Sequence, residues 1–139
     1  MKSPLIYRAA SILIGLFAAA HTVGFRQSNP KWGVDGLLAS MKSIHFETQG
    51  FHRSYWDFFS GFGFFVSIFL VLAALLAWQF GGLSRVELRA WLLMQWALAL
   101  CFIGVTVLSW RYFFMAPLLF SAVISVLLVI AAWLSSKVA

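Results

Sequence analysis

Side chains that could move or orient protons gather around the ends of long apolar segments. We interpret four of them as candidate catalytic residues: His21, Glu47, His52 and Asp57. A histidine changes its charge near neutral pH, and a carboxylate beside it can orient it or assist proton transfer. This combination predicts acid–base conversion, or simple binding, of a small molecule.

A second group of residues could hold an anionic or aromatic part of such a molecule. A guanidinium group binds phosphate or carboxylate through paired N–H donors. The candidate ligand-binding residues are Arg26, His45, Arg53, Tyr55, Trp56, Trp110 and Arg111. A structural reading stays open for most of them, because arginine, tyrosine and tryptophan also anchor helices at the membrane interface.

Structural alternatives also stay open for two of the candidate catalytic residues. His21 lies about one turn before the end of the first apolar segment, where a neutral imidazole could bond to a neighbouring helix. Asp57 follows Ser54 by three residues ahead of an apolar run, which is the pattern of a helix cap. A ligand site should show a cavity lined by both His21 and Asp57, whereas a structural role should leave them paired and packed.

The spacing of the histidines and cysteine does not indicate a metal centre. His45 and Glu47 are two residues apart, so on a helix they would point to different faces, and Gly50 interrupts the path to His52. The single cysteine, Cys101, cannot form an internal disulfide. We therefore expect no metal site and no cofactor.

Four apolar runs must position these residues. The chain is 63% hydrophobic and 10% charged, against about 45–50% and 25% in soluble domains. The fold class that this predicts is all-α, an integral membrane four-helix bundle in a single domain over residues 1–139. The expected spans are residues 4–25, 55–80, 86–110 and 117–134. The start resembles a signal peptide, but its apolar run continues to Phe25, so we expect an uncleaved first span.

Residues 32–53 form the one long polar stretch between the expected spans. Within it, a helical period is followed by Leu37, Leu38, Met41, Ile44 and Thr48. This pattern predicts a short amphipathic helix at the membrane interface between spans 1 and 2, ending near Gly50.

The net charge of +6 is the excess of ten Lys and Arg residues over four Asp and Glu residues, and the basic residues are scattered in ones and twos near the span ends. That placement favours contacts with membrane lipids and excludes a nucleic-acid partner, because no basic run is present. Four spans put both termini on one side. Basic residues are balanced between the two sides, but Lys2 and Arg8 at the first span favour cytoplasmic termini.

Three segments carry a resemblance to a known kind of protein: 21–25 closing the first span, 53–63 opening the second, and 110–117 at the last turn. Together they resemble a family of small bacterial four-span membrane proteins. The chain is also similar in size and helix count to DoxX-like membrane proteins. The resemblance implies a multi-pass protein of the bacterial inner (plasma) membrane and implies no particular activity.

Two classes of function follow from these observations. The first is binding or acid–base conversion of a lipophilic small molecule at the polar cluster on one membrane face. The alternative is a structural or accessory subunit of a larger membrane complex, since small residues in spans 1 and 2 suit helix–helix contacts. A channel is a third class, and with four spans it would require a homo-oligomer.

Overall fold

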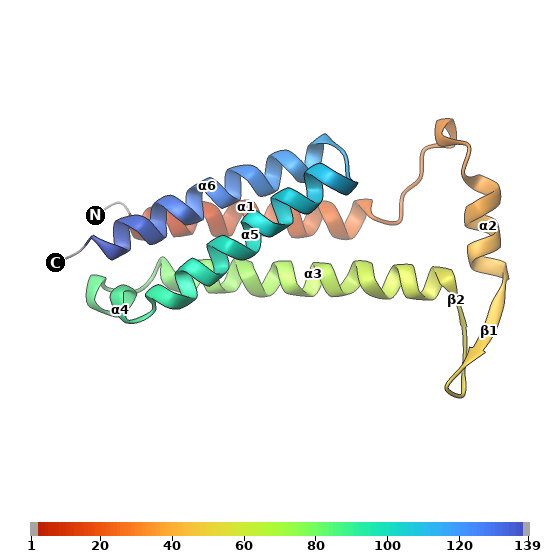
Figure 1. Cartoon of the computed structure of the whole chain (residues 1–139), viewed down its shortest axis with the longest axis horizontal. Helices are drawn as coiled ribbons and strands as arrows, with labels where there is room; N and C mark the ends of the chain where they lie inside the picture. The colour runs from red at the N-terminus through yellow and green to blue at the C-terminus, as the bar shows by residue number, and fades with distance from the viewer. Residues whose placement is uncertain (1–2, 138–139) are drawn as a thin grey trace. The chain divides into compact units, whose positions relative to one another are not determined.

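The computed structural model describes residues 3–137, so Lys2, used above to predict orientation, lies outside the described residues. The described chain forms six α-helices, a 3-10 turn and a two-stranded β-hairpin (Figure 1). By its contacts the chain divides into two compact units. Unit 1 comprises the residues up to Phe17 and from Leu70 onward, and unit 2 comprises Ala18–Phe69.

Four helices are long and apolar enough to cross a membrane, by length and composition. They are α1 (Ser3–Gly24), α3 (Tyr55–Phe80), α5 (Leu92–Tyr112) and α6 (Met115–Ser136). Their 21–26 residues correspond to about 32–39 Å of helix, enough for a hydrocarbon core of about 30 Å. The all-α fold class and the four long apolar helices are therefore confirmed.

The prediction that the third span, 86–110, is one continuous helix was wrong. It is divided into α4 (Arg85–Ala90) and α5, with a break at Trp91. No proline or glycine causes the break. The Gln95 side-chain amide donates to the Leu88 carbonyl, which also accepts from the Trp91 N–H. A side chain inserted into the backbone hydrogen-bond ladder in this way is a recognised cause of a helix bend.

Unit 1 is held together by contacts of α1 with each of its long neighbours. The Tyr7 hydroxyl donates to Gln95 Oε1 on α5 at 2.8 Å. The Tyr7 ring also meets Phe80 of α3 edge-on, with centroids 5.3 Å apart. Ser3 Oγ lies 2.7 Å from Ser135 Oγ of α6, so the two described ends of the chain are adjacent.

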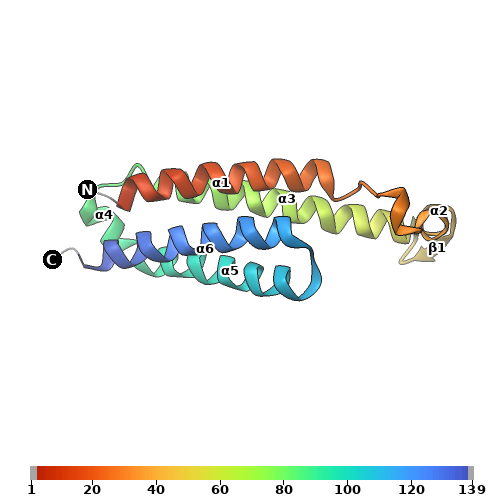
Figure 2. The same ribbon diagram turned by 90° about the horizontal axis from the view of Figure 1, so that it is seen from above.

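The helices α5 and α6 form an antiparallel pair joined by a short turn (Figures 1 and 2). Thr106 Oγ1 and Ser125 Oγ lie 3.0 Å apart across this pair. Small side chains on α6 permit this close approach: Ser121, Ser125, Ala131, Ala132 and Ser135 are all buried.

The helix expected between the first two spans is present only over the first part of its predicted range. After the 3-10 turn Pro30–Trp32, the helix α2 spans Asp35–Ser43 and then stops. Residues beyond it form strands β1 (His45–Thr48) and β2 (Phe51–Ser54). The turn residues Gln49 and Gly50 have φ values of 50° and 82°, the positive angles that a two-residue hairpin turn requires.

Unit 2 packs the end of α1 against the first half of α3 at a notch made by Gly63. A Cβ atom added to Gly63 would lie 2.2 Å from the Phe25 ring, so no side chain fits there while the ring stays in place. The Phe25 ring also packs edge-on against Phe64, with centroids 5.3 Å apart. Nearby, Thr22 Oγ1 donates to Ser67 Oγ at 2.8 Å.

Candidate functional site

The hairpin places three predicted site residues on one of its faces. His45 and Glu47 are two apart on β1, and Glu47 is paired directly opposite His52 on β2. Because alternate residues of a strand share a face, the expectation that His45 and Glu47 point apart was wrong. The imidazole rings of His45 and His52 stack with centroids 4.8 Å apart and planes 9° from parallel.

This face does not assemble a metal centre. Within residues 3–137, no group of three or more His, Cys, Asp or Glu side chains is placed to hold a metal ion. In the stacked pair the ring nitrogens lie in two parallel planes, so their lone pairs do not converge on one point. His45 Nδ1 instead donates to the Ser43 carbonyl at 3.0 Å.

The other face of the hairpin fixes it to the beginning of α3. The Phe46 ring packs on Tyr55 at 5.2 Å and on Phe58 at 5.9 Å between centroids. The Lys42 ammonium of α2 lies 4.4 Å from the Trp56 ring centroid. Tyr55 and Trp56, predicted to bind a ligand, thus contact the protein's own side chains.

Asp57 caps the N-terminus of α3 as its spacing from Ser54 predicted. Its Oδ2 accepts from the Ser54 backbone N–H at 2.8 Å and from Ser54 Oγ at 3.0 Å. In return, the Asp57 N–H donates to Ser54 Oγ at 3.3 Å. Ser54 is buried, whereas Asp57 is exposed, so the cap leaves the carboxylate open to its surroundings.

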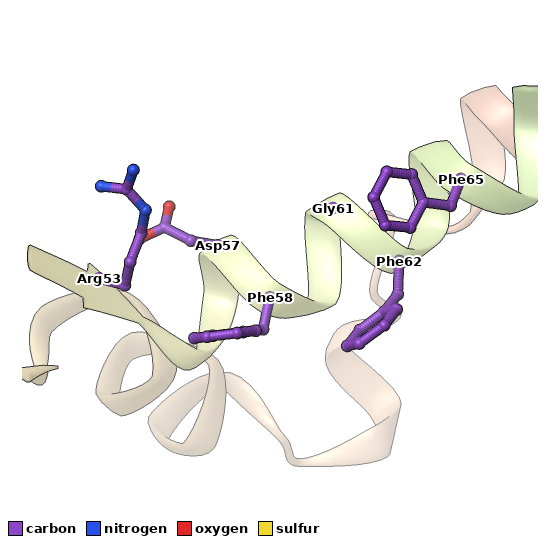
Figure 3. A pocket seen from close by; sticks show the side chains of 6 residues that line it. All are labelled: Arg53, Asp57, Phe58, Gly61, Phe62 and Phe65. Atoms are coloured by element: carbon purple, nitrogen blue, oxygen red, sulfur yellow. The ribbon is translucent and has the colours of Figure 1, made fainter. Parts of the chain in front are cut away.

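A groove of about 300 Å³ begins at this carboxylate and follows one face of α3 (Figure 3). Its lining residues are Arg53, Asp57, Phe58, Gly61, Phe62 and Phe65. Asp57, Gly61 and Phe65 recur every four residues and therefore share a face of the helix. Gly61 forms a gap in this face, because a Cβ added there would meet nothing within 4 Å.

The groove has one charged end and one aromatic part. The Arg53 and Asp57 side chains lie at the same end, and the phenylalanine rings follow along the helix (Figure 3). Arg53 is oriented by its own strand: Nη1 donates to the His52 carbonyl at 2.8 Å, and the guanidinium carbon lies 5.1 Å from the Phe51 ring centroid. Such an arrangement can hold a charged head group and an apolar tail.

His21 belongs to α1 and meets α3 away from the groove lining. Its Nε2 donates to the Gly63 carbonyl at 3.0 Å, and its ring stacks on Phe25 with centroids 5.2 Å apart. Gly61 and Gly63 are two residues apart, so they point about 200° from each other around the helix. The expected cavity lined by both His21 and Asp57 is therefore not the groove observed, which Asp57 lines without His21.

The remaining predicted arginines and tryptophan also lie outside the groove lining. The Arg26 guanidinium carbon is 5.0 Å from the Phe64 ring centroid. Trp110 and Arg111 belong to unit 1, at the end of α5, and Arg111 lies over Tyr112 at 5.6 Å. Of the three arginines predicted to hold an anionic group, the groove contains Arg53.

Sequence reasoning missed a buried polar network in unit 1. Tyr7 and Gln95 are fully buried and bonded to each other, and Ser135 is 2% exposed. A glutamine inside an apolar run was the available signal, because a buried amide requires partners. The groove phenylalanines were also missed, since lipid-facing and groove-lining phenylalanines look alike in a sequence.

Comparison with known protein families, curated proteins and solved structures finds no match to this chain. The function must therefore be argued from its own residues.

Proposed function

We propose that this chain is a multi-pass membrane protein that binds a lipophilic small molecule in the groove of α3. The observation that carries this proposal is the combination of Arg53 and Asp57 with the aromatic groove beside Gly61. Four helices of sufficient length and apolarity support the membrane setting. We retain a bacterial inner-membrane location, a DoxX-like four-span architecture and cytoplasmic termini as parts of the proposal.

The charged end supplies the specificity of this site. Small-molecule sites are mostly apolar and carry a few placed polar groups, as this groove does. Within a bilayer, an acyl chain gains little by leaving other lipid chains for the groove, because both surroundings are apolar. Contacts with Arg53 and Asp57 therefore decide which molecule is retained.

The geometry favours binding over acid–base conversion. A general acid or base must lie within hydrogen-bond reach of the proton that it transfers. His21 bonds to the Gly63 carbonyl, and neither it nor the two hairpin histidines lines the groove. Asp57 remains, and its Oδ2 is engaged by Ser54.

The test is native mass spectrometry with lipid extraction on the full chain purified in mild detergent. Gly61→Leu places a side chain in the open space of the groove and should abolish retention of the bound molecule. Gly104→Leu is the matched control, because Gly104 of α5 also has nothing within 4 Å of its Cβ position. Equal retention of a molecule by both variants would refute the proposal. So would the absence of any retained molecule from the two variants and the wild type alike.

A second function is favoured by the exposure of the same helix face. Phe62 is 65% exposed and Phe65 is 59% exposed, and Gly61 between them would allow a helix to approach closely. An accessory subunit would use this face to bind a larger membrane protein. The same purification separates the two functions, because the accessory role predicts a co-purifying polypeptide that Gly61→Leu releases.

A further inference from the structure

The charged end of the groove carries one positive and one negative group. Arg53 and Asp57 both line it, and both are exposed. A head group with only negative charge would be attracted by the guanidinium and repelled by the carboxylate. A head group with one charge of each sign satisfies both, which is the charge complementarity that gives a site its specificity.

We propose that the groove binds a zwitterionic aminophospholipid, with its phosphate on Arg53 and its primary ammonium on Asp57. This inference rests on the proposed function and adds the class of the ligand. The guanidinium has five N–H donors, and the bond to the His52 carbonyl uses one nitrogen, Nη1. Asp57 accepts both Ser54 bonds at Oδ2, so Oδ1 is the atom assigned to the ammonium.

The position of the groove along α3 fits a phospholipid. Asp57 is in the first turn of the helix, where a spanning helix meets the head groups. Phe65 is eight residues further along, about 12 Å at 1.5 Å per residue, which reaches from the head groups into the acyl chains. The charged groups and the rings are thus in the order in which a phospholipid presents its head and its chains.

The head group should be a primary rather than a quaternary ammonium. A primary ammonium donates hydrogen bonds to a carboxylate, and charge-assisted bonds of this kind are among the stronger ones. A quaternary ammonium has no N–H and is recognised by several aromatic faces around it. The charged end of this groove offers a carboxylate and a guanidinium (Figure 3).

The experiment uses the full chain in nanodiscs of equal parts phosphatidylethanolamine and phosphatidylglycerol, then transfer to mild detergent. Retained lipids are counted by native mass spectrometry. We expect phosphatidylethanolamine to be retained over phosphatidylglycerol by about tenfold, the effect of one charge-assisted bond. When phosphatidylcholine replaces phosphatidylethanolamine in the nanodiscs, its preference over phosphatidylglycerol should be lost.

Two substitutions separate the contributions of the charges. Asp57→Asn keeps an oxygen that can accept from Ser54 but removes the charge, so the preference should fall to about one. Arg53→Gln should lower the retention of phosphatidylethanolamine and of phosphatidylglycerol equally, because both lipids contain a phosphate.

A control variant should leave the preference unchanged. Glu87→Gln alters the equivalent capping carboxylate of α4, which does not line the groove.

The outcomes distinguish the two levels of the proposal. In one outcome, Gly61→Leu abolishes lipid retention but Asp57→Asn does not change the lipid preference. That outcome would overturn the head-group assignment and leave the groove as a binding site. Retention unaffected by Gly61→Leu would overturn both. Equal retention of phosphatidylcholine and phosphatidylethanolamine would also overturn the assignment, as would a polypeptide cross-linked to Phe62 in native membranes.

Discussion

The polar network of unit 1 and the charged end of the groove in unit 2 use polar side chains in opposite ways. In unit 1, Tyr7 and Gln95 are fully buried, and their polar atoms bond to each other and to the Leu88 carbonyl. In unit 2, Arg53 and Asp57 are held in place through backbone bonds but remain exposed. Removing a group should therefore reduce stability in unit 1 and binding in unit 2.

The largest effect should come from Gln95→Ala in the buried network. It removes partners from the Tyr7 hydroxyl and the Leu88 carbonyl and leaves a cavity, costing on the order of 2–4 kcal/mol of unfolding free energy. Thermal unfolding in detergent should show a clearly lower midpoint. Gln79→Ala, at an exposed glutamine, should change little. Equal unfolding midpoints for the two variants would contradict a stabilising role of the buried network in unit 1.

The next largest effect should come from Gly63→Ala, which tests the packing of unit 2. The new methyl group would overlap the Phe25 ring, so the ring must leave its place against Phe64, at a cost of about 1–3 kcal/mol. Gly61→Ala is the matched control on the same helix, and its methyl group meets open space. Similar unfolding midpoints for both variants would contradict the packing described.

A smaller effect should follow from His21→Phe. Phenylalanine keeps a ring against Phe25 but loses the bond to the Gly63 carbonyl, so unfolding should be easier by about 0.5–1.5 kcal/mol. Lipid retention should not change, because His21 does not line the groove. Loss of retention at unchanged stability would instead place His21 in the binding site.

The smallest effect concerns Glu87, which caps α4 as Asp57 caps α3 but does not line the groove. Hydrogen bonds from the Ser84 side chain and backbone lower the pKa of Glu87. The unfolded chain then binds this proton more tightly, so the stability contribution is present above the unfolded pKa and lost as pH falls through the folded one. Ser84→Ala should raise the Glu87 pKa in an NMR titration; an unchanged value would exclude the hydroxyl as a cause.

The long helices could be predicted because their signal is local. An apolar run of sufficient length defines a span regardless of what surrounds it. The break at Trp91 depends on Gln95 bonding to a carbonyl seven residues earlier, which no local pattern records. The hairpin was missed because Ile44 and Thr48, beyond the end of α2, continue its helical period. In addition, Gln49–Gly50 is a weaker turn signal than Asn–Gly.

The site was predictable in its charged part and not in its apolar part. Arg53 and Asp57 were chosen because ionisable side chains at the end of a span require an explanation. The groove itself depends on which side of α3 remains uncovered, and that is a property of packing. His21 and Asp57 have similar sequence signals, yet His21 of α1 bonds to the Gly63 carbonyl, whereas Asp57 shares the groove face of α3 with Gly61.

The strand β2 ends at Ser54 and α3 begins at Tyr55, with no residue between them. The two charges at the head of the groove therefore stand on different elements, with Arg53 on the strand and Asp57 on the helix. The angle between β2 and α3 at Ser54 therefore fixes how far the guanidinium stands from the carboxylate. The Ser54–Asp57 hydrogen bonds and the packing of Phe46 on Tyr55 and Phe58 hold that angle.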